Sequence, residues 1–276
     1  MRIISTVNEL RDGLAGQRVA FVPTMGNLHD GHLELMRQAR QYASVVVASI
    51  FVNPLQFGPN EDFDRYPRTF DTDCDKARSL VDVLFAPTVN DMYPQQQTLF
   101  VELPDIANEL CGAARPGHFR GMATVVLKLL NIVQPQVALF GKKDYQQLHI
   151  IRQMVKQFNM PVRIEGGETV RAADGLALSS RNQYLSGAER EEAPRLYRTL
   201  QEARSSLLRG ERDTERLQRE AIGVLADRGW LVDYVSVRDR LTLRAAQPSD
   251  HDWVILAAGT LGKTRLLDNI EVCLPG

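Results

Sequence analysis

Two histidines stand three residues apart in the segment PTMGNLHDGH (23–32), between an expected strand and an expected helix. A helix start presents unpaired backbone N–H groups and the positive end of the helix dipole, which both favour phosphate. Gly26 and Gly31 let the backbone come close to a ligand, and His29 and His32 lie on nearly one helical face. We therefore predict that this turn binds phosphate; the alternative is a turn with incidental histidines.

A second group of charges follows another expected strand, in GKKD (141–144). Lys142 and Lys143 put positive charge where the phosphates of a nucleotide could lie. Asp144 and Gln147 have the spacing of a helix-capping pair, so they have a structural interpretation beside a ligand-binding one. For Asp144 the sequence leaves both interpretations open.

A third segment, LSSR (178–181), offers two hydroxyls and a guanidinium, which can wrap a triphosphate. The alternative is a serine-rich loop that only leads into a helix. Because two histidines suited to phosphate lie upstream, we favour phosphate binding by Ser179, Ser180 and Arg181.

Amide side chains follow a nearly all-apolar expected strand, at Asn53 and Gln56. Amides donate and accept hydrogen bonds, which suits a substrate with hydroxyls and a carboxylate; ordinary loop polarity is the alternative. The next stretch, 57–69, mixes Gly, Pro and acidic residues and is either a mobile cover or a surface loop. Arg115 and His118 stand in a Pro/Gly loop, and the sequence leaves open whether they support a pocket.

Elements that position these residues alternate regularly in the first part of the chain. Apolar, β-branched runs predict strands and helical periodicity predicts helices. We expect strands at 18–22, 44–52, 81–85, 137–140 and 161–165, and helices at 32–43, 70–79, 119–133 and 144–158. This alternation predicts an α/β fold, a Rossmann-like parallel sheet domain over residues 1–168.

The pattern changes after residue 168, which predicts a smaller α+β C-terminal domain over 169–276. A long helix is expected at 187–209, with Ser186 and Glu189 as a capping box and Gly210 at its end. A second helix is expected at 214–228 and two strands at 233–237 and 253–259.

Composition restricts the classes of function. The chain has 276 residues, 44% of them hydrophobic, and a net charge of −1, which argues against a nucleic-acid partner. We find no export signal at the N-terminus and no apolar stretch long enough for a membrane helix. The three cysteines are scattered, without a metal-binding or disulfide pattern, and we interpret them as free thiols of a reducing cytosol.

HDGH resembles the HxGH signature of the nucleotidyltransferase superfamily, which includes the class I tRNA synthetases, and LSSR is similar to that superfamily's KMSKS loop. Four further segments resemble the pantothenate synthetase family, in its order and over most of the first 185 residues. They are SIFVNPLQFGPNEDFDRYPRT (49–69), RPGHFRGMATVVLKL (115–129), GKKDYQQL (141–148) and DGLALSSRNQYL (174–185). The resemblance implies that pantoate and ATP form pantoyl adenylate, which β-alanine then attacks to give pantothenate and AMP.

The resemblance also implies roles for single residues. It assigns catalysis to His29, His32, Lys143 and Arg181, and ATP binding to Met25, Gly26, His29, Gly31, His32, Gly141, Lys143, Asp144, Val170, Leu178, Ser179, Ser180 and Arg181. It assigns the substrates pantoate and β-alanine to Pro23, Met25, Asn53, Gln56 and Gln147. Mg²⁺ is expected with ATP, held mainly by its phosphates, and a cytoplasmic homodimer is implied.

Two positions depart from the family's pattern. Lys142 stands where many members have Glu, so we assign it no catalytic role, and Cys111 stands near a position that is acidic in some members. Three other functions are the alternatives. An HxGH adenylyltransferase would need extra cations for a second phosphate, and a tRNA synthetase would need an RNA-binding module. A nucleotide-binding regulator would show no turnover.

Overall fold

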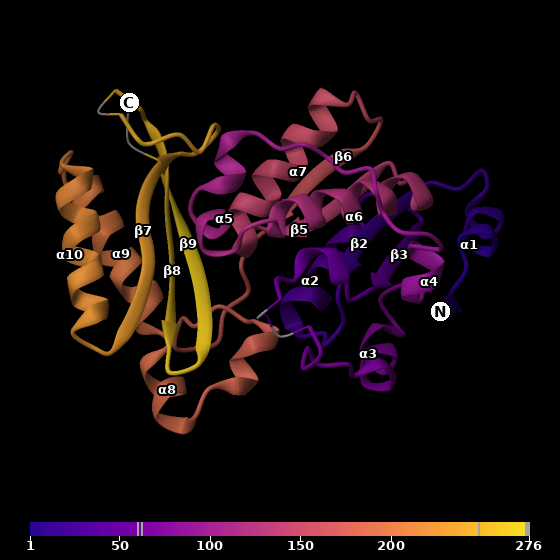
Figure 1. Cartoon of the computed structure of the whole chain (residues 1–276), viewed down its shortest axis with the longest axis horizontal. Coiled ribbons are helices and arrows are strands. Elements are labelled where there is room, and N and C mark those ends of the chain that lie inside the picture. Colours follow the sequence, from indigo (N-terminus) through magenta and orange to yellow (C-terminus); the bar gives the residue numbers. More distant parts are fainter. Residues whose placement is uncertain (60, 62, 248, 274–276) are drawn as a thin grey trace.

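The computed structural model describes residues 1–59, 61, 63–247 and 249–273, and its elements gather around two sheets (Figure 1). Within the described residues, six parallel strands form the first sheet in the order β1-β4-β3-β2-β5-β6. Their bounds are β1 (Arg2–Ile4), β2 (Val19–Thr24), β3 (Val45–Ile50), β4 (Val83–Phe85), β5 (Val137–Gly141) and β6 (Arg163–Gly167). The predicted Rossmann-like parallel sheet is therefore confirmed.

Helices cover both faces of this sheet. One face is covered by α1 (Val7–Leu14), α6 (His118–Val133) and α7 (Tyr145–Gln157), and the other by α2 (Asp30–Ala39) and α3 (Phe70–Ala77). Shorter elements connect them: α4 (Val89–Met92), α5 (Cys111–Ala114) and the 3-10 turns η1 (Pro54–Gln56), η2 (Asp105–Asn108), η3 (Lys142–Asp144) and η4 (Ser180–Tyr184).

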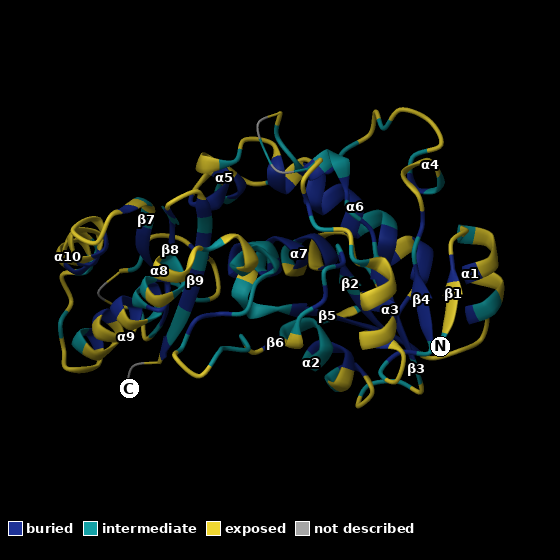
Figure 2. Cartoon of the chain, turned by 90° about the horizontal axis from the view of Figure 1, so that it is seen from below, coloured by how far each residue is buried: buried dark blue, intermediate teal, exposed yellow. Residues whose placement is uncertain are grey.

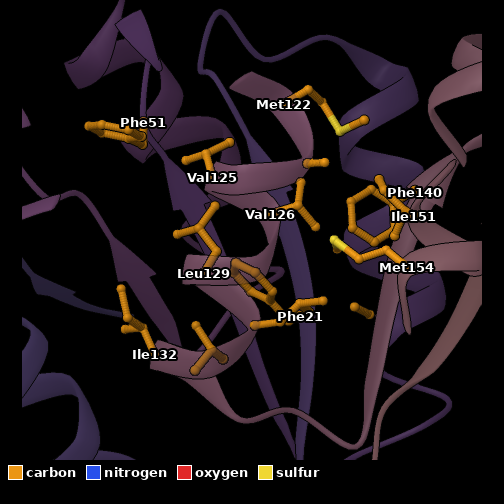
Figure 3. Packing of buried hydrophobic residues seen from close by; sticks show 14 of the residues in the cluster. Phe21, Phe51, Met122, Val125, Val126, Leu129, Ile132, Phe140, Ile151 and Met154 are labelled. Carbon is orange, nitrogen blue, oxygen red and sulfur yellow. The ribbon is translucent and has the colours of Figure 1, made fainter. Parts of the chain in front are cut away.

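The side chains of β2 contribute to the cores on both faces of the sheet, because successive side chains of a strand point to opposite faces. Phe21 packs into the core with α6 and α7, and its neighbour Ala20 packs into the core with α2 and α3. Figure 3 shows Phe21 in the first of these cores, with Leu129 of α6 and Met154 of α7. A strand buried on both faces is nearly all apolar, which is why the sequence revealed it.

The strand order changes direction at β2, which lies between β3 on one side and β5 on the other. Ligands of such sheets bind beyond the carboxyl ends of the strands at this switch point. The segments that leave β2, β3 and β5 are those in which the sequence predicted the site, so the topology brings them to one edge.

The chain after β6 builds a second, antiparallel sheet in the order β7-β8-β9, with β7 (Trp230–Asp239), β8 (Asp252–Leu261) and β9 (Thr264–Cys273). Helices α9 (Arg195–Leu208) and α10 (Thr214–Ala226) cover one face. Val254 and Leu256 on the other face pack against Leu110 and Tyr145. Figure 2 accordingly shows much of these strands as buried and the outer sides of α9 and α10 as exposed. The predicted α+β character of this part is confirmed.

Two details of the C-terminal part differ from prediction. The single helix expected at 187–209 is divided into α8 (Gly187–Glu192) and α9, because Pro194 lacks a backbone N–H and cannot continue a helix. The capping box of Ser186 and Glu189 is present at the start of α8. The sequence predicted two strands here, and β9 is an additional one.

The predicted boundary at residue 168 falls directly after β6, where the parallel sheet ends. No helix among the described residues combines the length and the apolar character needed to cross a membrane.

Candidate active site

A cavity of about 230 Å³ opens beyond the carboxyl ends of β2, β3 and β5. Among the described residues, its lining includes every predicted site residue except Gly26 and Asn53: Pro23, Met25, His29, Gly31, His32, Gln56, Gly141, Lys143, Asp144, Gln147, Val170, Leu178, Ser179, Ser180 and Arg181. A second cavity of about 630 Å³ adjoins it, shares Lys143, Ser179 and Arg181 with it, and extends to β9.

The two histidines cap the helix that they begin. His29 is the N-cap residue of α2, and its Nδ1 accepts the backbone N–H of Gly31 at 3.2 Å. Nδ1 of His32 accepts the backbone N–H of His29 at 3.3 Å. A backbone N–H can only donate, so each neutral ring must carry its proton on Nε2. Because both rings line the cavity, their Nε2–H groups are donors for a ligand there.

Both rings are neutral near pH 7. Burial and the charge of Lys143 lower the pKa of His29 to about 4. Burial and the neighbouring His29 hold the pKa of His32 well below its ordinary value. The ring centroids are 4.0 Å apart, a distance at which two imidazolium ions would repel each other. The pair therefore acts through neutral hydrogen bonds and not as a source of protons.

The turn before His29 is held by α3. The carboxylate of Asp73 accepts the backbone N–H groups of Asn27 at 2.8 Å and Leu28 at 2.7 Å. Nζ of Lys76 donates to the carbonyl of Leu28 at 2.6 Å. These three hydrogen bonds fix the peptide groups that lead into the helix start.

Gly26 shapes this turn without lining the cavity. Its φ of 81° lies in the left-handed region, which glycine adopts at little cost. A Cβ at this position would lie 3.0 Å from Cγ2 of Ile50 and 3.1 Å from Oδ2 of Asp73. The structure thus gives Gly26 a conformational role, beside the ATP-binding role that we predicted.

Asn53 lies beneath the cavity and is only 1% exposed. Its Nδ2 donates to Oε1 of Gln56 at 3.1 Å and to the carbonyl of Gly121 at 3.2 Å, and its Oδ1 accepts the N–H of Leu55 and the hydroxyl of Tyr93. We expected this amide to face the substrate, but its hydrogen bonds are made within the protein. Asn53 orients Gln56, which does line the cavity.

Close packing of η1 on α6 places Gln56. A Cβ on Gly121 of α6 would lie 1.9 Å from the carbonyl oxygen of Leu55, so only glycine fits at this contact. Nε2 of Gln56 lies 3.1 Å from Sδ of Met25, the residue that directly follows β2. The amide thus stands where β2 and β3 end together.

The two lysines that follow β5 separate. Lys143 lines both cavities. Lys142 pairs instead with Glu168 and Glu271 and is not part of the cavity lining among the described residues. Burial alone would lower the pKa of Lys142, but its hydrogen bonds to these two carboxylates outweigh burial and raise it. Lys142 therefore connects η3 to β9, and that it has no catalytic role stays a prediction.

The capping interpretation of Asp144 is wrong. Asp144 precedes α7, but within the described part of the chain its side chain forms no capping hydrogen bond. The 3-10 turn η3 leads directly into α7, and the carboxylate, 49% exposed, lines the cavity, with Nζ of Lys143 4.0 Å away.

The loop at 178–181 contacts the histidine turn. Oγ of Ser180 donates to the carbonyl of Asn27 at 3.2 Å, and Nδ2 of Asn27 donates to the carbonyl of Ser180 at 3.4 Å. Oγ of Ser179 accepts the N–H of Arg181 at 3.2 Å, which begins η4. Two segments whose contacting residues are 153 positions apart in the sequence thus share one side of the cavity.

The segment 57–69 contributes a wall. Phe57 and Tyr66 line the cavity, and Glu61 forms a two-point ion pair with Arg115 at 2.8 and 2.6 Å. Residues 60 and 62 of this segment lie outside the described residues. The lining position favours a cover over a plain surface loop, while its predicted mobility stays a prediction.

Arg115 and His118 belong to the same wall. Nδ1–H of His118 donates to the carbonyl of Gln56 at 2.8 Å, and its Nε2 accepts from Nη1 of Arg115 at 3.0 Å. Burial and the charge of Arg115 lower the pKa of His118 to about 4. The ring therefore connects the cover segment to Gln56 as a neutral group.

The sequence did not identify the apolar end of the cavity. Met122, Val125, Val126 and Leu129 of α6 and Phe140 of β5 line it. The sequence predicted a helix at 119–133 and a strand at 137–140, but an apolar pattern does not distinguish a face that packs on protein from one that meets a ligand.

Across the described residues, no group of three or more His, Cys, Asp or Glu is arranged to hold a metal ion. The carboxylate of Asp144 lies among cationic and hydroxyl groups at the cavity. Such a site suits a triphosphate that brings its own Mg²⁺, which commonly binds one or two carboxylates besides phosphates.

Comparison with known proteins gives a consistent result. The family model described as pantoate-beta-alanine ligase matches residues 2–271. The pantothenate synthetases of Methylobacillus flagellatus and Nitrosospira multiformis are both 55% identical to this chain, over 98% and 99% of it and 98% of each relative.

Solved structures agree. The pantothenate synthetase of Thermus thermophilus superposes with a TM-score of 0.95 at 46% identity, with all of both chains covered. The pantoate-beta-alanine ligase of Francisella tularensis, complexed with beta-gamma ATP and β-alanine, gives a TM-score of 0.82 at 38% identity over 98% of this chain and 97% of that one. Since family model, relatives and structures agree over nearly the full length, the chain belongs to the pantoate-β-alanine ligase family.

Proposed function

We propose that this chain is a pantothenate synthetase that condenses pantoate with β-alanine at the expense of ATP. The observation that carries the proposal is the cavity itself. Neutral histidine donors, Lys143 and the loop 178–181 lie on its polar side, and Gln56 lies beside an apolar wall. Pantoate has a carboxylate, two hydroxyls and a carbon with two methyl groups, which match an amide beside apolar side chains.

The polar side suits adenylation. In this step a pantoate carboxylate oxygen attacks the α-phosphorus of ATP, the bond from that phosphorus to the bridging oxygen breaks, and pyrophosphate leaves. Negative charge shifts onto phosphate oxygens, so fixed donors and cations at those oxygens lower the barrier. We assign this role to His29, His32, Lys143, Ser179 and Arg181, with Ser180 holding the loop against the histidine turn.

The second step needs no protein nucleophile. The amine nitrogen of β-alanine attacks the acyl carbon of pantoyl adenylate, the bond from that carbon to the phosphate oxygen breaks, and AMP leaves as the amine gives up a proton. Holding the adenylate and the amine in one cavity makes this step effectively unimolecular. Gln56 and Gln147 are our candidates for holding the pantoyl group, with Asn53 acting through Gln56.

Mg²⁺ would bind the ATP phosphates and neutralise their charge, with Asp144, whose carboxylate lies 4.0 Å from Nζ of Lys143, as the candidate protein ligand. We further propose that residues 1–168 and 169–276 form two domains of each subunit, and that two such subunits form a homodimer in the cytoplasm. Cys74, Cys111 and Cys273 are free thiols in the described chain, as a reducing compartment permits.

The test is an assay of AMP formation in which ATP is present and pantoate and β-alanine are omitted in turn. The proposal requires that AMP form only when both are supplied. AMP formation with a phosphorylated acceptor instead would favour an adenylyltransferase, and nucleotide binding without turnover would favour a regulator.

A further inference from the structure

Strand β9 touches both segments that we assign to the phosphates of ATP. Of the two edge strands of the antiparallel sheet, it is the one that faces the parallel sheet (Figure 1). It packs against η3, which holds Lys143, and against η4, which begins at Ser180. The adjoining cavity of about 630 Å³ extends between these segments and β9.

Asn269 fixes the first of these segments. Its side chain is buried, and its Nδ2 donates to two successive backbone carbonyls, those of Lys142 at 2.9 Å and Lys143 at 2.8 Å. Both donors of one amide are therefore used on η3. Because they hold the peptide group of Lys143 itself, they set the direction in which its side chain leaves the backbone.

Asp268 fixes the second segment. Its carboxylate, also buried, forms a two-point ion pair with Arg171 at 2.6 and 2.8 Å. Arg171 follows Val170, whose carbonyl accepts the N–H of Leu178 at 2.9 Å, so the ion pair anchors the hairpin that leads into 178–181. The same carboxylate accepts the backbone N–H of Asn269 at 2.8 Å, which links the two anchors.

We propose that Asp268 and Asn269 are positioning residues that set the spacing between Lys143 and the loop 178–181, and thereby the fit to the β- and γ-phosphates. The proposal rests on the ATP site described under the proposed function. Charge-assisted and amide hydrogen bonds between buried groups hold a narrow geometry, and displacement of a binding group by about 1 Å can cost about a hundredfold in rate.

The test compares affinities for ATP with Mg²⁺ and for AMP, measured by calorimetry on the full chain. The variants are Asn269→Ala and Asp268→Asn. The matched control is Asp250→Asn, because Asp250 forms the same kind of two-point ion pair, with Arg244, and is not among the described residues that line either cavity.

AMP lacks the β- and γ-phosphates, so a misplaced Lys143 or loop 178–181 should weaken ATP alone. We expect both variants to bind ATP about tenfold more weakly, because one or more hydrogen bonds from charged groups to the phosphates are misplaced. Their affinity for AMP should stay within about twofold of that of the unmodified chain. The control should keep both affinities within about twofold of the unmodified chain.

Equal loss of ATP and AMP affinity, or no loss of either, would show that β9 only packs against the loops and would overturn the proposal. Thermal unfolding checks that the variants fold, and Asp268→Asn, which preserves side-chain size, carries the test if Asn269→Ala does not fold. An unmodified chain that binds both nucleotides but forms no AMP from pantoate and β-alanine would contradict the proposed function and leave this comparison intact.

Discussion

Lys142 and Lys143 are consecutive in the sequence but their side chains serve different parts of the molecule. Lys143 faces the cavity, where an ammonium group can meet phosphate oxygens. Lys142 joins the end of β5 to β9 through Glu271 and to the chain after β6 through Glu168. At the scale of the residue, the partners of a charge decide whether it binds ligand or braces the fold.

This difference can be tested by substitution. Lys143→Ala should lower the rate of adenylation by about 10²–10³, because it removes a cation that stabilises transition-state charge. Lys142→Met should leave the rate within about threefold but lower thermal stability, since two ion pairs are lost. Pre-steady-state formation of the adenylate measures the first effect. Similar rate losses in both variants would refute the division of roles.

Gln56 offers the sharpest test of which end of the cavity holds pantoate. Gln56→Ala should reduce kcat/KM for pantoate by roughly 1–3 kcal/mol, or about tenfold to a hundredfold, because hydrogen bonds to the acid are lost. ATP affinity, followed by calorimetry, should stay within about twofold because the residues that we assign to the phosphates lie on other segments of the chain. A variant with weakened ATP binding and an unchanged KM for pantoate would mean that the two ligands lie the other way round.

At the scale of elements, η1 depends on α6 for its position. The contact between Leu55 and Gly121 brings backbone against backbone, and Asn53 donates to the same glycine's carbonyl. The site thus uses a helix of the core as the base on which a three-residue turn is set.

Gly121→Ala tests this contact. The added methyl group would meet the Leu55 carbonyl at 1.9 Å, so η1 or α6 must move. We expect a loss of about 1–3 kcal/mol in the free energy of unfolding. We also expect the variant to have a higher KM for pantoate than the unmodified chain has. Urea unfolding and steady-state kinetics measure the two effects. Gly223 of α10, where an added Cβ would meet nothing within 4 Å, changed to alanine, is a control for helix propensity alone.

Local sequence signals identified most strands of the parallel sheet and, with the family resemblance, the polar side of the cavity, because strand ends and helix starts are set by nearby residues. The apolar run of β3 and Gly26 in the turn before α2 are such signals. They failed for β9, where TRLLDNIEVC carries Asp268, Asn269 and Glu271 among its apolar residues. The partners of these polar residues lie far away in the sequence, so the strand pattern is obscured.

Roles that depend on burial were also out of reach. Asn53 and Gln56 are both amides after one strand, and only the structure shows that the first is enclosed and the second faces the cavity. We assigned Lys142 no catalytic role because it departs from the family's pattern. Its ion-pair partners, Glu168 and Glu271, could not be inferred from sequence spacing.

At the scale of the whole molecule, folding buries three histidines in their neutral form at the cavity. Burial, with nearby positive charge, lowers the pKa of His29 and His118 to about 4, and burial lowers that of His32. In the unfolded chain their pKa is about 6.5. Between about pH 4 and 6.5 the unfolded chain therefore binds more protons, so stability rises with pH across this window and falls on acidification.

The expected result is a lower free energy of unfolding at pH 5 than at pH 7, measured by urea unfolding. His118→Asn, which can keep the hydrogen bond to the Gln56 carbonyl, should weaken this pH dependence because one titrating group is removed. Adenylation itself should show no histidine titration between pH 6 and 8. A pH dependence of stability that is identical in His118→Asn and the unmodified chain would contradict the assignment.

The order of the two chemical steps is the central claim, and isotope exchange tests it most directly. The chain is mixed with ATP, Mg²⁺, pantoate and labelled pyrophosphate, without β-alanine. If pantoate attacks ATP first, adenylation runs in reverse and label enters ATP under these conditions, and omission of pantoate abolishes the exchange. Exchange that appears only after β-alanine is added would contradict formation of the adenylate before the amine reacts.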